Sequence, residues 1–163
     1  MRHAKSDWDA DFESDHDRPL NERGIHSARL MGRVLAGRAL APDLVISSTA
    51  VRARTTAELA VEAGGWDCAI RLDRDLYESG PGGVLAAASM APDVRSLMLV
   101  GHQPTWSVLV MELTGEAVDM KTAAVAVVET GVDTWSGLTG AEGKLVEALF
   151  PGDFAGSEWD RVG

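Results

Sequence analysis

The chain has 163 residues, a length that suits a single domain large enough to bury a core without disulfide or metal staples. Its 25 Asp and Glu residues against 15 Lys and Arg give a formal net charge of −10, and such a surface repels nucleic-acid phosphates and anionic membranes. We therefore expect no nucleic-acid and no membrane partner, and a phosphorylated substrate would need positive charge gathered locally in a pocket.

The chain begins with MRHAKSDWDA, which places Arg2 and His3 ahead of any apolar run long enough to form a strand. In the α/β fold that the following segments predict, a first strand would precede such a turn, yet Met1 alone stands before Arg2. We expect either a stub or a first strand truncated before Arg2, and we favour the truncation.

Apolar runs and helical patterns then alternate. Residues 21–38 carry apolar side chains at helical spacing, with Asn21 as the N-cap. The run PDLVISS at 42–48 is typical of a central parallel strand covered on both faces, and residues 51–63 predict a second helix that ends at a glycine pair. Cys68 is the one cysteine; it leads into a short strand, and we assign it to packing. Because a single cysteine cannot form an internal disulfide, we expect a reducing, cytoplasmic location.

The second half continues the alternation. LMLVG at 97–101 predicts another buried strand, and a proline and a glycine bracket a helix over 104–114. Residues 122–129 and 144–150 are β-branched and alternating enough to be strands. We predict a three-layer α/β/α sandwich with a mostly parallel central sheet, formed by a single domain of residues 1–163. Its polar, glycine-rich tail, 152–163, is expected to be loosely ordered.

Arginine and histidine follow the predicted strands where each ends. Arg2 and His3 come after the stub, Arg52 after the strand at 42–48, and His102 after the strand at 97–101. Ligands of open α/β sheets bind outside the carboxyl ends of the strands, so we expect these side chains to converge there. Arginine forks match phosphate oxygens, and a histidine that is neutral at pH 7 can attack phosphorus. The set predicts phosphoryl transfer through a phosphohistidine, with no metal or cofactor required.

Five segments together resemble the histidine phosphatase superfamily, and specifically its small SixA-type phosphohistidine phosphatase branch: RHAKS, RPLNERG, PDLVISSTAVRARTTAE, LYE and VGHQP. The resemblance implies a phosphoglycerate mutase-like fold. It implies that His3 is the nucleophile and that Arg2, Arg52 and His102 form the phosphate pocket. Ala4 replaces the glycine that usually follows the nucleophile, and this form is familiar in the SixA-type branch.

Larger members of the family have an acidic residue in a middle loop that protonates the leaving group. The nearest candidate here is Glu78, with Asp75 second, and the branch can lack the acid altogether. An alkoxide leaving group needs such an acid, typically for about 10²- to 10⁴-fold in rate, whereas an imidazole does not, because its other nitrogen can already hold a proton. Lys5 and Ser6 follow the nucleophile closely and are further candidates to bind the substrate's phosphate.

We therefore expect a metal-independent phosphatase that uses a phospho-His3 intermediate to remove phosphate from phosphohistidine on a phosphorelay or phosphotransfer protein. One alternative is a small-molecule phosphomonoesterase for sugar or nucleotide phosphates, with Glu78 as general acid. Another is a non-catalytic regulatory module that binds a phosphorylated partner in the same pocket.

Overall fold

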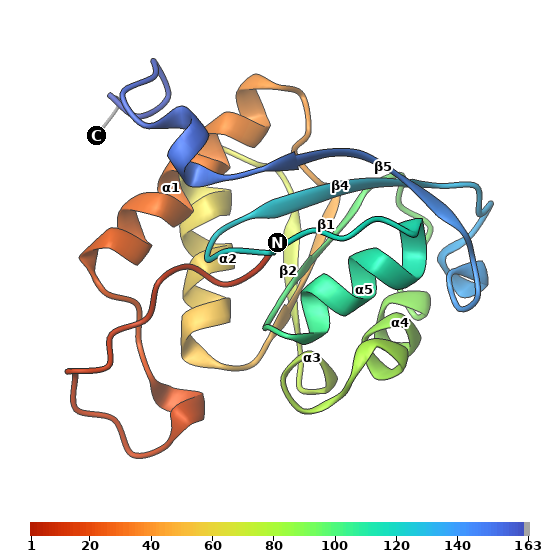
Figure 1. Ribbon diagram of the computed structural model, residues 1–163, viewed down its shortest axis with the longest axis horizontal. Helices are drawn as coiled ribbons and strands as arrows, with labels where there is room; N and C mark the ends of the chain where they lie inside the picture. Colours follow the sequence, from red (N-terminus) through yellow and green to blue (C-terminus); the bar gives the residue numbers. More distant parts are fainter. Residues whose placement is uncertain (162–163) are drawn as a thin grey trace.

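Helices and strands alternate along the chain in the computed structural model, which describes residues 1–161 (Figure 1). The strands are β1 (Leu44–Ser48), β2 (Ala69–Asp73), β3 (Leu97–Val100), β4 (Val125–Thr130) and β5 (Gly143–Leu149). The helices are α1 (Glu22–Gly37), α2 (Val51–Gly64), α3 (Asp75–Glu78), α4 (Pro81–Ser89) and α5 (Thr105–Thr114), with short 3-10 turns η1 (Asp15–Asp17), η2 (Trp135–Gly137) and η3 (Pro151–Phe154). The predicted helices and strands are present, and α3 and α4 are additional to them.

The sheet is built around β1. All five of its residues are buried, and it pairs in parallel with β2 on one edge and β3 on the other. The strands β4 and β5 form a separate antiparallel pair. Residues 1–3 lie between these two parts: Arg2 bridges Gly101 in parallel, and its backbone N–H donates to the carbonyl oxygen of Ala124 at 3.0 Å. Residues 1–3 are thus hydrogen-bonded on both sides.

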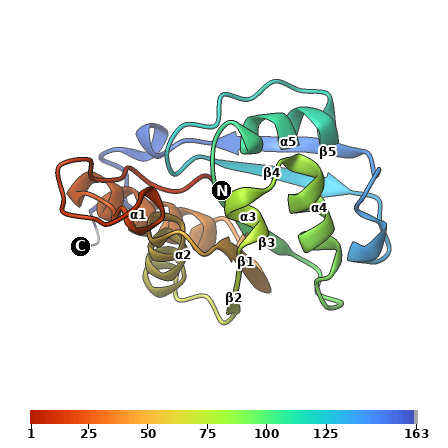
Figure 2. The same ribbon diagram turned by 90° about the horizontal axis from the view of Figure 1, so that it is seen from below.

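Helices cover both faces of the sheet, as Figure 2 shows, with α1 and α2 on one side and α4 and α5 on the other. Side chains of β1 alternate between the two faces. Val45 packs in the core cluster of α1 and α2, whereas Leu44 and Ile46 pack in the cluster of α4 and α5. The prediction of a three-layer α/β/α sandwich with a mostly parallel sheet is confirmed.

Two glycines of α1 allow close backbone contacts that position the start of the chain. A Cβ at Gly32 would lie 2.2 Å from the carbonyl oxygen of Ala60, so α1 and α2 approach backbone to backbone. A Cβ at Gly24 would lie 2.1 Å from the carbonyl oxygen of Lys5. The segment after His3 is therefore fixed directly against α1.

The polar tail runs back along α1. The guanidinium Nε of Arg33 donates to the carbonyl oxygen of Trp159 at 2.6 Å, and His26 lies 2.7 Å from the carboxylate of Asp160. Residues 162 and 163 of the predicted loose tail lie outside the described residues. Within residues 1–161, no helix combines the length and apolar character needed to cross a bilayer.

Candidate active site

The surroundings of His3 determine its tautomer and its charge. Its side chain is buried, and its Nδ1 lies 2.7 Å from the carbonyl oxygen of Ala4. A carbonyl can only accept, so Nδ1 carries the proton and Nε2 keeps a free lone pair. Burial lowers the pKa of His3 to about 3, and the nearby His102, Arg52 and Arg2 also lower it against the effect of the Ala4 carbonyl. The imidazole is therefore neutral at pH 7.

The backbone around His3 is held from two sides. Its N–H donates to the carbonyl oxygen of Gly101 at 2.9 Å, at the carboxyl end of β3. The next N–H, that of Ala4, donates to Thr56 Oγ1 at 2.9 Å, and this hydroxyl donates in turn to the carbonyl oxygen of Arg52 at 2.6 Å. Thr56, one turn after Arg52 on α2, thus ties the segment of His3 to the helix that carries the arginine.

The two predicted arginines lie beside His3. Arg52, in the first turn of α2, is 5% exposed; its Nη1 donates to the carbonyl oxygen of Asp15 at 2.5 Å and its Nη2 to the Asp15 carboxylate at 2.9 Å. Arg2 donates from Nη1 to the carbonyl oxygen of Met120 at 2.9 Å. Burial lowers the pKa of Arg2 from its usual value, which Asp119 partly offsets.

His102 follows β3, and its ring centroid lies 5.1 Å from that of His3. Its Nε2 is 2.8 Å from Ser48 Oγ, and this oxygen already accepts the N–H of Ala50 at 3.1 Å. The Ser48 hydroxyl can donate its proton to Nε2, and in that arrangement a neutral His102 carries its own proton on Nδ1. Burial, with Arg52 second, lowers the pKa of His102 to about 4.

Three buried nitrogen atoms of this site have no hydrogen-bond partner among the described residues: Arg2 Nε, Arg52 Nε and His102 Nδ1. Buried donors without partners are rare in folded proteins, and each one costs free energy unless a ligand or water satisfies it. The two arginine Nε atoms each carry a proton to donate, and His102 Nδ1 carries one when Ser48 donates to Nε2. Together with the free Nε2 of His3, they can surround an oxyanion with a nucleophile beside it.

The loop before α1 contributes residues that the sequence analysis did not single out or left open. Arg18 is 5% exposed, donates to the carboxylate of Asp15 at 2.9 Å and to Ser6 Oγ, and lies 3.6 Å under the ring of Trp8. In the sequence, Arg18 could be found through the segment RPLNERG, which is one of the five segments that carry the family resemblance. No sequence pattern predicts a role for Asp15, because its position at the site depends on how the loop packs over α2.

On the opposite side, α3 places Tyr77 at the site. Its hydroxyl donates to the carboxylate of Asp15 at 3.2 Å, and its ring packs edge-on against His102 and His16, with centroids 5.4 and 4.9 Å away. Hydrogen bonding to Arg18 and Arg52 and their positive charges hold the pKa of Asp15 below its usual value, against the opposing effect of burial. Asp15 is thus ionised; its carboxylate accepts from Nη2 of Arg52, and its carbonyl oxygen accepts from Nη1.

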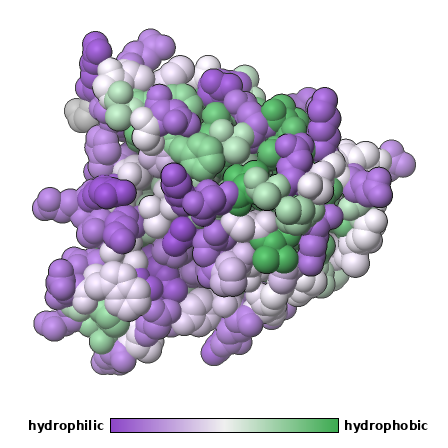
Figure 3. Space-filling view, viewed as in Figure 1, coloured by the Kyte–Doolittle hydropathy of each residue, from purple (hydrophilic) through white to green (hydrophobic). Residues whose placement is uncertain are grey.

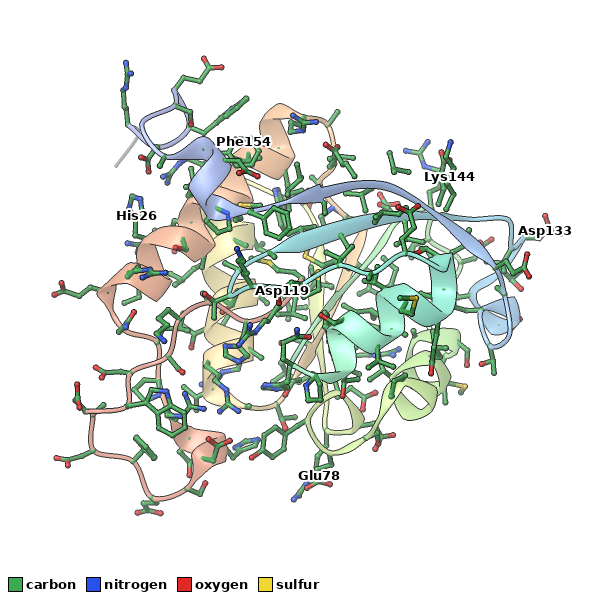
Figure 4. All side chains as sticks on the ribbon, viewed as in Figure 1. His26, Glu78, Asp119, Asp133, Lys144 and Phe154 are labelled. Carbon is green, nitrogen blue, oxygen red and sulfur yellow. The ribbon has the colours of Figure 1, made fainter. Side chains whose placement is uncertain are left out.

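The remaining candidates lie as follows. Glu78 is half-exposed and paired with Arg74, whose Nη2 is 2.8 Å from Glu78 Oε1, and Figure 4 shows its side chain pointing away from the body of the protein. Asp75 is exposed in the first turn of α3. Ser6 is buried and accepts from Arg18, whereas Lys5 is exposed. The fold thus brings together Arg2, His3, Arg52 and His102 and places Glu78 and Lys5 at the surface.

Two other groups complete the inventory. Cys68 is partly buried against the core, and burial raises the pKa of its thiol, which fits a packing role. In the part of the chain that the structure describes, no three His, Cys, Asp or Glu side chains gather closely enough to hold a metal ion.

Comparisons with known proteins identify relatives of this arrangement. The sequence model of the histidine phosphatase superfamily (branch 1) matches residues 1–88. Protein Rv1276c of Mycobacterium tuberculosis, an uncharacterized protein, is 43% identical over 114 residues, which cover 69% of each chain.

Among solved structures, the protein histidine phosphatase SixA complexed with tungstate is similar, with a TM-score of 0.79 and 28% identity over 94% of this chain and 96% of SixA. SixA from Nakamurella multipartitia gives a TM-score of 0.78 and 30% identity over 93% of each chain.

Proposed function

The chain belongs to branch 1 of the histidine phosphatase superfamily and is a phosphatase of the SixA type, and from this premise we propose that it hydrolyses phosphohistidine on a protein. In this proposal His3 is the nucleophile, and Arg2, Arg52 and His102 bind the phosphoryl group. The observation that carries it is the set of unpartnered donors, Arg2 Nε, Arg52 Nε and His102 Nδ1, around the free Nε2 of His3.

The reaction then has two steps. His3 Nε2 attacks phosphorus; a P–N bond to His3 forms while the P–N bond to the substrate's imidazole breaks, and the electron pair leaves with that imidazole. Water next attacks the phosphorus of phospho-His3, which releases inorganic phosphate and restores the neutral His3. The arginines and the Nδ1–H of His102 stabilise the charge on the phosphoryl oxygens in both steps.

The leaving group supports phosphohistidine over an ester. An imidazole whose other nitrogen is protonated leaves as a neutral molecule, so no acid is needed at the pocket. An alcohol needs a proton from a positioned acid, and the nearest predicted acid, Glu78, is paired with Arg74 at the surface. The structure therefore supplies what a phosphoramidate requires without assigning a proton donor for an ester.

The negative charge of the loop beside the phosphate site, residues 7–17, also supports a protein substrate. Six carboxylates lie in the eleven residues of the loop beside the pocket: Asp7, Asp9, Asp11, Glu13, Asp15 and Asp17. In Figure 3, hydrophilic side chains dominate the side of the molecule where the first 20 residues lie in Figure 1. This rim repels small polyanions such as nucleotides and complements a basic surface around a phosphorylated histidine.

The test is phosphate release from a histidine-phosphorylated phosphotransfer domain, measured beside a panel of sugar and nucleotide monoesters. His3→Ala is the test variant, and His26→Ala, which changes an exposed histidine of α1, is the matched control. We expect release from phosphohistidine to be preferred, abolished by His3→Ala and unaffected by His26→Ala.

Two results would overturn the proposal. A preference for a monoester would assign the protein to the small-molecule phosphatases. Binding of vanadate without any release that depends on His3 would assign it to the phosphate-binding modules. Trapping of phosphate on His3 by a quench into alkaline denaturant, in which a P–N bond is stable, would support the two-step reaction in its own right.

A further inference from the structure

Tyr77 is the one tyrosine of the chain, and the two reaction steps described above assign it no role. It belongs to the single turn of α3, which lies at the end of the molecule where β1 and β3 end (Figure 1). Its side chain is partly exposed, whereas His3 is buried. Because its ring also contacts His102, Tyr77 lies between the phosphate site and the solvent.

The position of Tyr77 is fixed by contacts with other parts of the chain. Its ring packs edge-on against His102, which follows β3, and against His16 of η1, with centroids 5.4 and 4.9 Å away. His16 is itself held, since its Nε2 lies 2.9 Å from Thr49 Oγ1. The Tyr77 hydroxyl donates to the carboxylate of Asp15 at 3.2 Å. The hydroxyl therefore has a defined place at the site, although α3 is short.

The hydroxyl of Tyr77 can accept a hydrogen bond as well as donate one. Burial, and after it the charge and the hydrogen bond of Asp15, raise the pKa of Tyr77, whereas Arg52 lowers it. The hydroxyl is therefore protonated at pH 7, and it donates this proton to an ionised carboxylate. A hydroxyl oxygen has two lone pairs besides its proton, and donation to an anion makes that oxygen a better acceptor. It can thus accept an N–H of a substrate.

In-line transfer determines on which side of the phosphoryl group the leaving group lies. The attacking and leaving atoms stand on opposite sides of phosphorus. His3 attacks from the interior, because it is buried and its Nδ1 is held by the carbonyl oxygen of Ala4. The leaving group consequently points towards the solvent, where Tyr77 lies. One carboxylate oxygen of Asp15 accepts from Arg52 at 2.9 Å and from Tyr77 at 3.2 Å, so the hydroxyl is close to the guanidinium that binds the phosphoryl group.

The leaving imidazole needs an acceptor for its second nitrogen. When the P–N bond breaks, the electron pair goes to the nitrogen that was bonded to phosphorus. The ring leaves as a neutral molecule only if the second nitrogen keeps its proton throughout. A hydrogen bond from that N–H to an acceptor favours the protonated form. The Tyr77 hydroxyl is such an acceptor on the side to which the ring departs.

We propose that Tyr77 determines the specificity for the leaving group: its hydroxyl accepts the N–H of the substrate's imidazole while Asp15 holds the hydroxyl in place. The inference rests on the proposed function and deepens it, since it assigns the leaving group a binding partner. The proton stays on the second ring nitrogen throughout, so Tyr77 transfers no proton itself. A leaving group without an N–H, such as the carboxylate of an acyl phosphate, cannot make this hydrogen bond.

The test compares the wild type with Tyr77→Phe on three substrates: a histidine-phosphorylated phosphotransfer domain, phosphoimidazole, and phosphoimidazole methylated on its second nitrogen. Below the pKa of that nitrogen, the two small substrates carry the same charge and differ in the N–H alone. We expect Tyr77→Phe to lower kcat/KM about tenfold on the domain and on phosphoimidazole, as for the loss of a hydrogen bond to a charged group, and to leave the methylated substrate unchanged. Phenylalanine keeps the ring contacts with His16 and His102, so the Tm should not change.

An unchanged kcat/KM of Tyr77→Phe on the phosphotransfer domain would overturn the inference. An equal loss on phosphoimidazole and on its methylated form would also overturn it, because Tyr77 would then support the pocket rather than bind the N–H. In both cases phosphate release that depends on His3 would remain, so the proposed function would stand. The absence of any His3-dependent release from phosphohistidine in the wild type would overturn both, which distinguishes the two failures.

Discussion

Removing the carboxylate of Asp15 should tighten the binding of phosphate-like anions. Asp15 holds both Nη groups of Arg52, one through its carbonyl oxygen and one through its carboxylate, and its carboxylate also accepts from Arg18. A phosphoryl group bound at the unpartnered Nε of Arg52 can also accept from Nη2 of the same guanidinium, the donor that the Asp15 carboxylate occupies. In an Asp15→Ala variant the carbonyl oxygen still holds Arg52 Nη1, so the guanidinium stays in place while Nη2 becomes free.

The magnitude follows from the exposure of the ion pair. The side chain of Asp15 is 50% exposed and that of Arg52 is 6% exposed. Hydrogen bonds to charged groups contribute about 1.5–3 kcal/mol when buried, and exposed ion pairs about 0.2–1 kcal/mol. For this half-exposed pair we take about 1 kcal/mol, which corresponds to an affinity about fivefold higher.

The assay is titration calorimetry with orthovanadate or inorganic phosphate at moderate salt. Asp17→Ala is the matched control, since Asp17 carries the same charge on the same loop and bonds to Ser14. Weaker anion binding by Asp15→Ala than by Asp17→Ala would refute the reasoning, because Asp15 would then position Arg52 rather than compete for it. Equal, small gains in anion affinity in both variants would mean that the effect comes from the lower negative charge of the loop and not from a freed arginine donor.

Three further predictions concern the acid, the helix contact and pH. Glu78→Gln should change the rate on phosphohistidine less than about threefold, against 10²-fold or more for a working general acid, as steady-state kinetics can decide. Gly32→Ala should lower the free energy of unfolding by about 1–3 kcal/mol, because the new Cβ would meet a backbone oxygen. Gly82→Ala, whose Cβ would have nothing within 4 Å, should raise it by up to about 1 kcal/mol. Equal urea midpoints for the two variants would contradict this. In the folded protein the pKa values of His3 and His102 are about 3 and about 4, below the value of 6.5 in the unfolded chain. As the pH falls, the unfolded chain therefore binds protons before the folded protein does. The free energy of unfolding that is present above pH 6.5 consequently falls as the pH drops towards 4. Each histidine contributes a slope of up to about 1.4 kcal/mol per pH unit, and a flat urea-unfolding profile between pH 7 and 5 would contradict it.

The sequence predicts those parts of the fold whose signal is local. Continuous apolar runs mark β1 and β3, because these strands are covered on both faces, and helical spacing marks α1. Helix α4 is missed, since its first turn contains Gly82 and Gly83, which indicate a loop by composition. Pro81 at its first position was the available signal. Packing of its alanines and Val84 against α5 makes it a helix, and that contact is tertiary.

The residues of the site also fall into those that the sequence predicts and those that it does not. Arg52 and His102 follow the ends of β1 and β3, so the topology of a parallel sheet is enough to place them together, and Arg2 and His3 join them through the bridge from Arg2 to Gly101. Asp15 and Arg18 belong to a loop, and their positions depend on where that loop crosses α2, which no periodicity encodes. Their pairing with Arg52 and Ser6 emerges when the loop packs.

The stretch DLYES shows how a local rule separates two neighbouring side chains. Successive residues of a helix point about 100° apart, so Tyr77 and Glu78 on the single turn of α3 do not face the same direction. Arg74 stands four residues before Glu78, a spacing that favours an ion pair on the outer surface, and the structure contains that pair. Tyr77 consequently faces Asp15 and His102. For Glu78 to act as an acid, the pair with Arg74 would have to open and α3 would have to rotate, which a phosphohistidine substrate does not require.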